Sequence, residues 1–289
     1  MGAPSTPLDV QRFLVPKTGS TTEECEDAIA VSPSPDASSL FAAVADGASE
    51  SLLAGAWARR LVRGAVASMA VATDERGDGQ DGRGRPSGSF VENLLSHTVD
   101  QWDGYVAEYQ AERAARGRPI AWYEQPGLDK GAFATLMAVH LTADSAEPAA
   151  RKDIRHWTWR AFALGDTCLF HLRDGGLVTS FPLTDGDGFG ITPQLLGSRN
   201  RDATLIADRA STASGELHAG DELLLATDAL AAWLLSHPDV DSGGAGRQLG
   251  SLADLGDEDF ADWVESERDK SRMRNDDVAL LRLRVRAER

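Results

Sequence analysis

Cysteines and long apolar runs are both scarce in this sequence. Its 289 residues contain only two cysteines, Cys25 and Cys168, which cannot form the disulfide framework of a small secreted domain. No apolar run approaches the about 20 residues that cross a bilayer. The first residues lack the basic and apolar regions of a signal peptide. We therefore expect a cytoplasmic protein with no membrane partner.

Positive charge is also scarce. The chain has 29 Lys and Arg residues against 45 Asp and Glu residues, for a net charge of −16. Nucleic-acid backbones select basic surfaces, so a nucleic acid is excluded as the main partner. Neither an internal repeat nor a break in composition divides the chain, and we expect one domain over residues 1–289. The Gly-rich polar stretch at 74–89 has no apolar period, which predicts a flexible surface loop.

The sequence lacks the patterns of nucleophilic catalysis and of histidine metal sites. Its six histidines show no HExxH or HxxxH spacing. Cys168 lies within an apolar β-type run, which is typical of a core position. The GDGFG segment at 186–190 lacks the lysine and the strand–turn–helix context of a phosphate-binding loop, and we interpret it as a turn.

The order of apolar patterns predicts an α+β layered sandwich. Short apolar runs that predict strands alternate with few helical patterns, which argues against a Rossmann-type domain. Helical spacing predicts one helix from Ser49, as N-cap, to residue 72, and a second long helix over 89–116. The runs at 155–164, 167–173 and 176–183 have short connections, so we expect them to pair antiparallel in succession. Predicted strands cover 12–17, 28–34, 40–47, 133–143, 155–164, 167–173, 176–183, the start of 222–237, and 277–286; the helix at 257–273 precedes the last of them.

Acidic pairs recur where apolar runs meet turns. Carboxylates from the ends of several strands are the ligands that Mg²⁺ and Mn²⁺ prefer, so together these pairs predict a composite metal site. Each pair also has an ordinary structural explanation: a helix cap for Asp46 or Asp228, a hairpin turn for Asp166, and solvated loop charge for the others. The pairs are Glu26-Asp27, Asp46-Gly47, Gly165-Asp166, Thr227-Asp228 and Asp276-Asp277.

Six short motifs, in this order, resemble the metal-dependent Ser/Thr protein phosphatases of type 2C, the PPM family. They are ECEDA, VADG, GAFATLMAV, ALGDTCLF, LLLATDAL and NDDVALL, and the resemblance extends over about residues 10–286. It implies a four-layer αββα sandwich with two central antiparallel sheets and a metal cleft at one end.

The resemblance also implies roles for individual residues. Asp46 would bridge two Mn²⁺ or Mg²⁺ ions, and the Gly47 carbonyl would bind one of them. Glu26 would hold the first ion through water, whereas Asp228 and Asp276 would hold the second. Asp166, together with Asp228, would bind a third, weaker ion. Asp46 and Asp228 are the expected catalytic residues.

One departure from the family pattern concerns the phosphate. The family usually places an arginine four residues before the motif glutamate, where this chain has Thr22; Lys17 or another arginine is the candidate to replace it. The resemblance implies hydrolysis of phosphoserine and phosphothreonine in proteins by a metal-activated water, opposing a Ser/Thr kinase. The alternatives are a phosphoprotein-binding module with reduced or no turnover, and a hydrolase of small phosphoesters.

Overall fold

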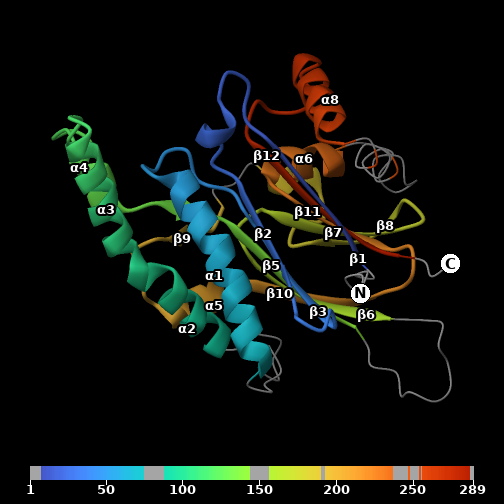
Figure 1. Ribbon diagram of the computed structural model, residues 1–289. Helices are drawn as coiled ribbons and strands as arrows, with labels where there is room; N and C mark the ends of the chain where they lie inside the picture. Colours follow the sequence, from blue (N-terminus) through green and yellow to red (C-terminus); the bar gives the residue numbers. More distant parts are fainter. Residues whose placement is uncertain are drawn as a thin grey trace, which may run out of the picture.

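The computed structural model describes residues 8–74, 88–143, 156–189, 193–236, 247, 254 and 256–286 (Figure 1). Within them, two five-stranded antiparallel sheets and one two-stranded sheet are formed. The predicted surface loop at 74–89 lies mostly outside the described residues. Only its two ends are described, and they belong to helices.

The first large sheet pairs strands that lie far apart in the sequence. Its order is β1-β12-β11-β7-β8, so the first described strand lies against the last one. The central strands are continuous apolar runs, because both faces of this sheet are covered. The strands are β1 (Leu8–Val15), β7 (Cys168–Arg173), β8 (Gly176–Phe181), β11 (Glu222–Ala226) and β12 (Val278–Val285).

The second large sheet has the order β10-β6-β5-β3-β2. Its edge strand β10 (Ser211–Leu217, STASGEL) carries few apolar residues and has no counterpart in the sequence prediction. Such a strand forms through its ladder with β6. The other strands are β2 (Ala28–Pro33), β3 (Ser39–Ala45), β5 (Leu136–Ala143) and β6 (Trp157–Leu164); β4 (Phe133–Ala134) and β9 (Leu196–Gly197) form the small sheet.

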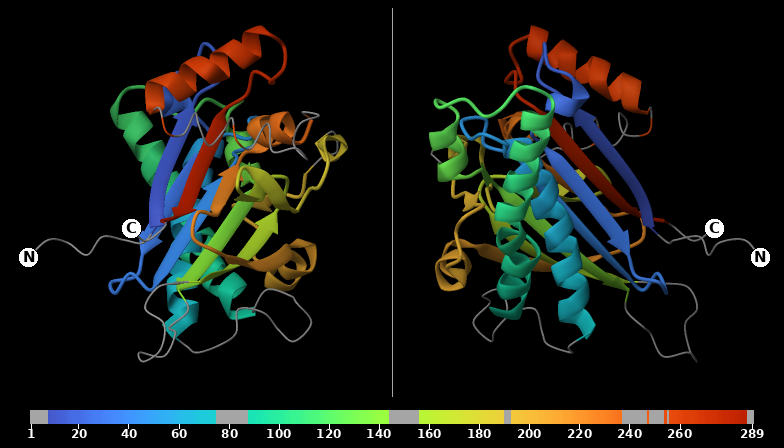
Figure 2. Two further views of the ribbon diagram at one scale, coloured as in Figure 1. Left: turned by 90° about the vertical axis from the view of Figure 1, so that its right-hand side faces the viewer. Right: turned by 60° about the vertical axis from the view of Figure 1, so that its left-hand side comes forward.

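Helices cover the outer faces of both large sheets (Figures 1 and 2). Helices α1 to α3 and α5 lie on the side of the second sheet, and α6 and α8 lie on the side of the first. The α-helices are α1 (Ala54–Asp74), α2 (Gly88–His97), α3 (Trp102–Ala115), α4 (Gln125–Lys130), α5 (Ala203–Arg209), α6 (Asp228–Ser236) and α8 (Asp257–Asp269). Short 3₁₀ turns are η1 (Thr22–Glu24), η2 (Val99–Gln101) and η3 (Gly186–Gly188).

Three apolar layers separate these four layers of structure. The middle one joins the two sheets, with Leu8 and Leu283 from the first sheet packed in one cluster with Leu40 and Val139 from the second. The outer two join each sheet to its helices. The predicted fold class, an α+β sandwich of two antiparallel sheets flanked by helices, is therefore confirmed.

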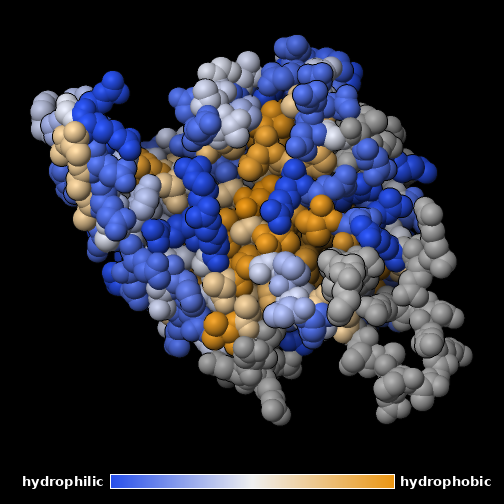
Figure 3. All heavy atoms as spheres, in the orientation of Figure 1, coloured by the Kyte–Doolittle hydropathy of each residue, from blue (hydrophilic) through white to orange (hydrophobic). Residues whose placement is uncertain are grey.

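The face shown in Figure 3 carries apolar residues along its middle, where β1 and β2 run at the edges of their sheets. Partly buried Val10, Ile29 and Val31 of these strands pack against the core between the sheets. Among the described helices, none has the length and apolar character that a membrane span requires.

The predicted long second helix is wrong, because it is broken at Thr98. Helix α2 ends at His97, and α3 starts only at Trp102, after the turn η2. The Thr98 hydroxyl donates to the carbonyl of Leu94 at 2.6 Å, a local bond that competes with the regular helical ladder and bends helices. Ser49 does not cap the first helix either, because α1 begins at Ala54.

The predicted succession of paired strands is also wrong at one connection. Strands β7 and β8 pair with each other, but β6 pairs with β5 and β10 in the other sheet. The connection from Gly165 to Thr167 thus crosses between the sheets and is not a hairpin. Gly165 has a φ of +105°, and a Cβ there would lie 2.6 Å from Thr135 Cγ2, so this crossing requires glycine.

Candidate metal and phosphate site

The acidic pairs of the sequence meet at one end of the sandwich because of the strand register. In the first sheet Val15 faces Val278, and Ala226 faces both Leu280 and Cys168. The segments that leave β1 and β11 therefore lie beside those that enter β12 and β7. In the second sheet Ala28 faces Ala45 and Leu136 faces Leu164. The segments before β2 and β5 therefore lie beside those that follow β3 and β6. All the predicted site residues lie in these segments.

Asp46 is fixed at the end of β3 by Thr135. The Asp46 amide donates to Thr135 Oγ1 at 3.1 Å, and the Thr135 amide donates to the Asp46 carbonyl at 2.8 Å. Thr135 Oγ1 also lies 2.5 Å from Thr167 Oγ1. One buried threonine thus ties Asp46 to the crossing that carries Asp166. The sequence contains this threonine in the motif GAFATLMAV but assigns it no role.

Gly47 allows a close approach of three segments. A Cβ at this position would lie 2.8 Å from the carbonyl oxygen of Glu26 and 3.0 Å from that of Ala54. Backbone atoms cannot move aside as a flexible side chain can, so any larger residue would separate Asp46-Gly47 from Glu26. The predicted use of the Gly47 carbonyl as a ligand stays a prediction.

The carboxylates at this end strongly perturb one another. Burial raises the pKa of Asp46 well above its ordinary value, and the charges of Asp27, Asp228, Asp166 and Asp276 raise it further. Burial, followed by the charge of Asp228, raises the pKa of Asp166 to about 6. Burial also raises the pKa of Asp228; Arg274 acts in the opposite direction, and Asp276 adds to the rise. This concentration of negative charge is the electrostatic setting that a cation relieves.

Asp27 belongs to this group, although the sequence assigns the ligand role to Glu26. The Asp27 side chain is buried, and its Oδ2 has no hydrogen-bond partner among the described residues. Burial raises the pKa of Asp27 well above its ordinary value; the Thr227 hydroxyl acts in the opposite direction, and the charges of Asp277, Asp228 and Asp276 raise it again. A buried, unpaired carboxylate oxygen is costly, and a bound cation would satisfy it. A hard divalent ion therefore fits the residues present.

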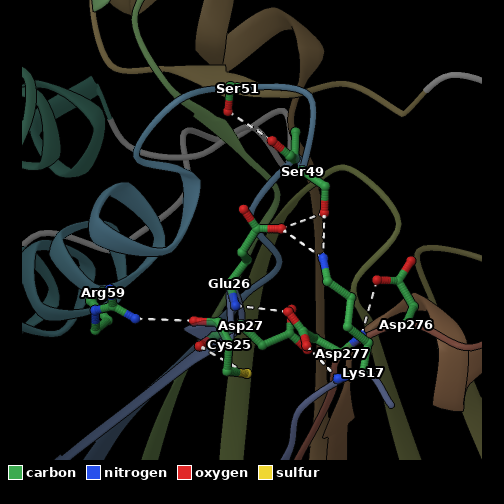
Figure 4. Close-up of polar contacts among 10 residues, drawn as sticks. Lys17, Cys25, Glu26, Asp27, Ser49, Ser51, Arg59, Asp276 and Asp277 are labelled. Carbon is green, nitrogen blue, oxygen red and sulfur yellow. Dashed lines mark hydrogen bonds and ion pairs between the residues drawn. The ribbon is translucent and has the colours of Figure 1, made fainter. Parts of the chain in front are cut away.

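The carboxylate of Glu26 points toward Lys17 and Ser49. It lies 3.3 Å from Lys17 Nζ and accepts a hydrogen bond from Ser49 Oγ, as Figure 4 shows. Burial tends to lower the pKa of Lys17, but Glu26, Asp277 and Asp276 raise it overall, so the ammonium ion is retained. The predicted role of Glu26, binding an ion through water, stays a prediction.

Asp277 holds the strand ends in place. It is buried, its Oδ1 accepts the amide N–H of Lys17 at 2.7 Å, and its Oδ2 accepts that of Glu26 at 2.8 Å (Figure 4). Its neighbour Asp276 is half-buried and accepts the Asp277 amide at 2.9 Å. Arg268 of α8 donates to the Asp276 carbonyl at 2.5 Å. The pair thus divides into a positioning residue, Asp277, and a candidate ligand, Asp276.

Arg274 brings positive charge to the aspartates. Its Nη2 lies 2.5 Å from Asp228 Oδ2, at the start of α6. Burial acts to lower the pKa of Arg274, but Asp228, Asp276 and Asp166 raise it overall. Neither Arg274 nor Asp27 is a site residue of the sequence prediction. Asp27 stands directly before an apolar strand, a signal that could have found it, whereas Arg274 lies in a polar turn without a period.

The aspartates share one end of the fold without forming a closed coordination shell. Within the described ranges, no three Asp, Glu, His or Cys side chains are grouped as they would be around a single ion. The prediction that Asp46, Asp228 and Asp276 bind common ions therefore stays a prediction.

Two solved structures have this fold over nearly all of the chain. The photosystem II phosphatase PBCP is 14% identical, with a TM-score of 0.52 over 97% of this chain and 100% of that chain. The PP2C phosphatase domain of SpoIIE from Bacillus subtilis, with a fragment of its regulatory domain, is 14% identical, with a TM-score of 0.50 over 98% of this chain and 64% of that chain. The sequence itself matches no family model and no curated protein.

The comparison establishes the fold. At this level of identity, the chain has the architecture of PP2C-type phosphatases, and the resemblance predicted from the six sequence motifs is confirmed at that level. What the site does has to be argued from its own residues.

Proposed function

We propose that this protein is a metal-dependent phosphatase that hydrolyses phosphoserine or phosphothreonine in proteins, with residues 1–289 as one phosphatase domain. One observation carries the proposal: aspartates with raised pKa values, half-buried or, for Asp27, buried, lie at one end of a PP2C-type fold, and Asp27 has an oxygen without a partner among the described residues. Such a set of oxygen donors suits Mn²⁺ or Mg²⁺.

Each of the candidate residues would have its own role in metal binding. Asp46 would bridge two ions, and the Gly47 carbonyl would bind one of them. Asp228 and Asp276 would hold the second ion, and Asp166 with Asp228 a third, weaker one. To this set we add Asp27, because its Oδ2 has no partner among the described residues and the charges of Asp228 and Asp276 act on it too. Glu26 would act through water, within reach of Lys17 and Ser49.

Divalent cations bound there would supply a water of lowered pKa and balance charge on the phosphoryl oxygens. Side chains of the protein fix the backbone of the site by hydrogen bonds. Thr135 accepts the Asp46 amide, and Asp277 accepts the amides of Lys17 and Glu26. Both cysteines have a pKa raised by burial to about 12, so neither offers a thiolate at neutral pH. Their free, buried state supports a cytoplasmic location.

The protein substrate and an opposing Ser/Thr kinase as partner rest on the resemblance to protein phosphatases. A phosphoprotein-binding module with reduced turnover is the second candidate. It is favoured by Thr22, which is exposed at the start of η1 and offers no guanidinium for phosphate.

Metal-dependent hydrolysis tests the proposal. Protein stripped with EDTA should be inactive, and added Mn²⁺ or Mg²⁺ should restore hydrolysis of both p-nitrophenyl phosphate and a phosphothreonine peptide. Hydrolysis of small esters alone would favour a small-phosphoester hydrolase. Binding of the phosphopeptide without hydrolysis would favour the binding module, and activity that survives complete removal of metal would refute the metal mechanism.

A further inference from the structure

Arg274 forms an ion pair with Asp228, one of the proposed ligands. It lies in the turn before β12, and its side chain is 52% exposed, whereas that of its partner Asp228 is 17% exposed. The guanidinium group therefore contacts the Asp228 carboxylate and stays half exposed to solvent.

Asp228 has two possible partners. Its Oδ2 lies 2.5 Å from Arg274 Nη2, and the same carboxylate is the proposed ligand of the second ion. A divalent ion attracts a carboxylate more strongly than a single positive charge does at a similar distance. Binding of the ion would therefore compete with Arg274 and leave its donors free.

We propose that Arg274 is the phosphate-binding arginine of this chain and that, before metal binds, it occupies Asp228 in place of a cation. This inference rests on the proposed function. An arginine offers a planar fork of donors that matches two phosphate oxygens, which Thr22 cannot do. Released from Asp228, the half-exposed guanidinium stays beside the ions that would hold the phosphoryl group.

Lys17 is the competing candidate. Its ammonium is held by Glu26 Oε2 and Ser49 Oγ, each at 3.3 Å. Lys17 thus bonds to Glu26 and Ser49, whereas Arg274 contacts Asp228, a proposed ligand of the second ion. A lysine is also a point charge and cannot bind phosphate through two parallel bonds. The geometry therefore favours Arg274.

The first experiment measures metal binding without turnover. Titration calorimetry with Mn²⁺ alone would compare EDTA-stripped wild type, Arg274→Gln and the control Arg272→Gln. Arg272 lies two residues away, is also exposed, and pairs at 3.8 Å with Glu267 of α8. Loss of the competing ion pair in Arg274→Gln should tighten Mn²⁺ binding about 2- to 5-fold. The control should change less than about 1.5-fold at physiological salt. Equal changes in the two variants would overturn the competition.

The second experiment measures phosphate binding and kinetics. Inorganic phosphate should bind Mn²⁺-loaded Arg274→Gln about 10- to 150-fold more weakly than wild type, and KM for a phosphothreonine peptide should rise by a similar factor. Arg274→Lys keeps the charge and should recover only part of this loss. Unchanged phosphate affinity in Arg274→Gln, with a loss in Lys17→Met, would assign the role to Lys17 and overturn the inference.

The two experiments separate this inference from the proposed function. A wild-type protein that hydrolyses no phosphoester would refute the phosphatase proposal, while the Mn²⁺ titration would still decide whether Arg274 competes at Asp228. If the enzyme is active but Arg274→Gln leaves its phosphate affinity and KM unchanged, only the inference about Arg274 is refuted.

Discussion

Strand β11 has a buried aspartate network at one end and the candidate site at the other. Asp221, just before the strand, accepts bonds from Arg173 at 2.9 and 2.7 Å, from His171 at 3.0 Å, and from the His218 amide at 2.9 Å. Although burial tends to raise its pKa, Arg173 and these other donors hold the pKa of Asp221 at about 2.

At the opposite end of the strand, the pKa of a buried aspartate is raised and not lowered. Asp27 is 3% exposed and Asp221 is 2% exposed, yet the pKa of Asp27 is raised by burial and by neighbouring carboxylates. Burial acts in the same direction on both carboxyls and is the largest influence on Asp27, whereas at Asp221 the donors outweigh it. Donors from the chain complete the first network, whereas the described residues offer Asp27 only the Thr227 hydroxyl and leave its Oδ2 without a partner. The first network serves the fold, and the second is suited to a ligand.

The largest effect should come from Asp46→Asn. Removing one charged oxygen from the proposed bridging ligand should lower Mn²⁺-dependent hydrolysis of p-nitrophenyl phosphate by about 100-fold or more, since even second-sphere changes cost 10–100-fold. The fold should persist, because the change relieves repulsion among the aspartates. Circular dichroism checks the fold. Activity equal to that of wild type would remove Asp46 from the site.

Asp221→Asn is the matched change at the other end of β11. It should destabilise the protein by about 2–4 kcal/mol, because it weakens the bonds of Arg173 and His171 to a buried anion. Urea unfolding measures this loss. Activity per folded molecule should stay at the wild-type level, and a selective loss of activity would mean that the two ends of β11 are not independent.

The stability of the metal-free protein should depend on pH through Asp166. In the folded protein the pKa of Asp166 is about 6, above its ordinary value, so protonation of this carboxyl stabilises the fold. That stabilisation is lost as the pH rises through about 6. We expect EDTA-treated protein to lose on the order of 1–3 kcal/mol between about pH 4 and pH 7. Mn²⁺ should remove most of this loss. Thermal melts across this range measure it, and a metal-free protein that gains stability instead would contradict the described electrostatics.

The smallest effect should come from Thr22→Arg. A second guanidinium near the site should lower KM for a phosphothreonine peptide, but by less than about 10-fold if Arg274 already binds the phosphate. In an Arg274→Gln background the same change should have a larger effect. Steady-state kinetics of the two single variants and the double variant decide this. Equal effects of Thr22→Arg in both backgrounds would show that the two positions do not share a substrate group.

The sequence predicts the layers of the fold and most of the candidate site for a local reason. Buried strands are continuous apolar runs, and an acidic residue that ends such a run must lie at an end of the sheet. Asp46 and Asp228 could be found in this way. Pairing partners could not, because β10 is polar and β1 pairs with β12 across almost the whole chain.

The sequence also could not predict the roles of residues whose partners lie far away along the chain. Asp277 looks like a second loop carboxylate until its oxygens are seen to accept the amides of Lys17 and Glu26. Arg274 looks like one of several basic residues in a polar turn until that turn lies against Asp228. In both cases the partner, and not the residue type, defines the role.

The bonds of Asp277 have a consequence for the order of events during synthesis. They join residues 260 and 251 positions apart, so the loops at Lys17 and Glu26 cannot reach their final arrangement until β12 has left the ribosome. Contacts this distant in sequence form late and slowly. A nascent chain that has completed β1 through β11 would still lack a competent site.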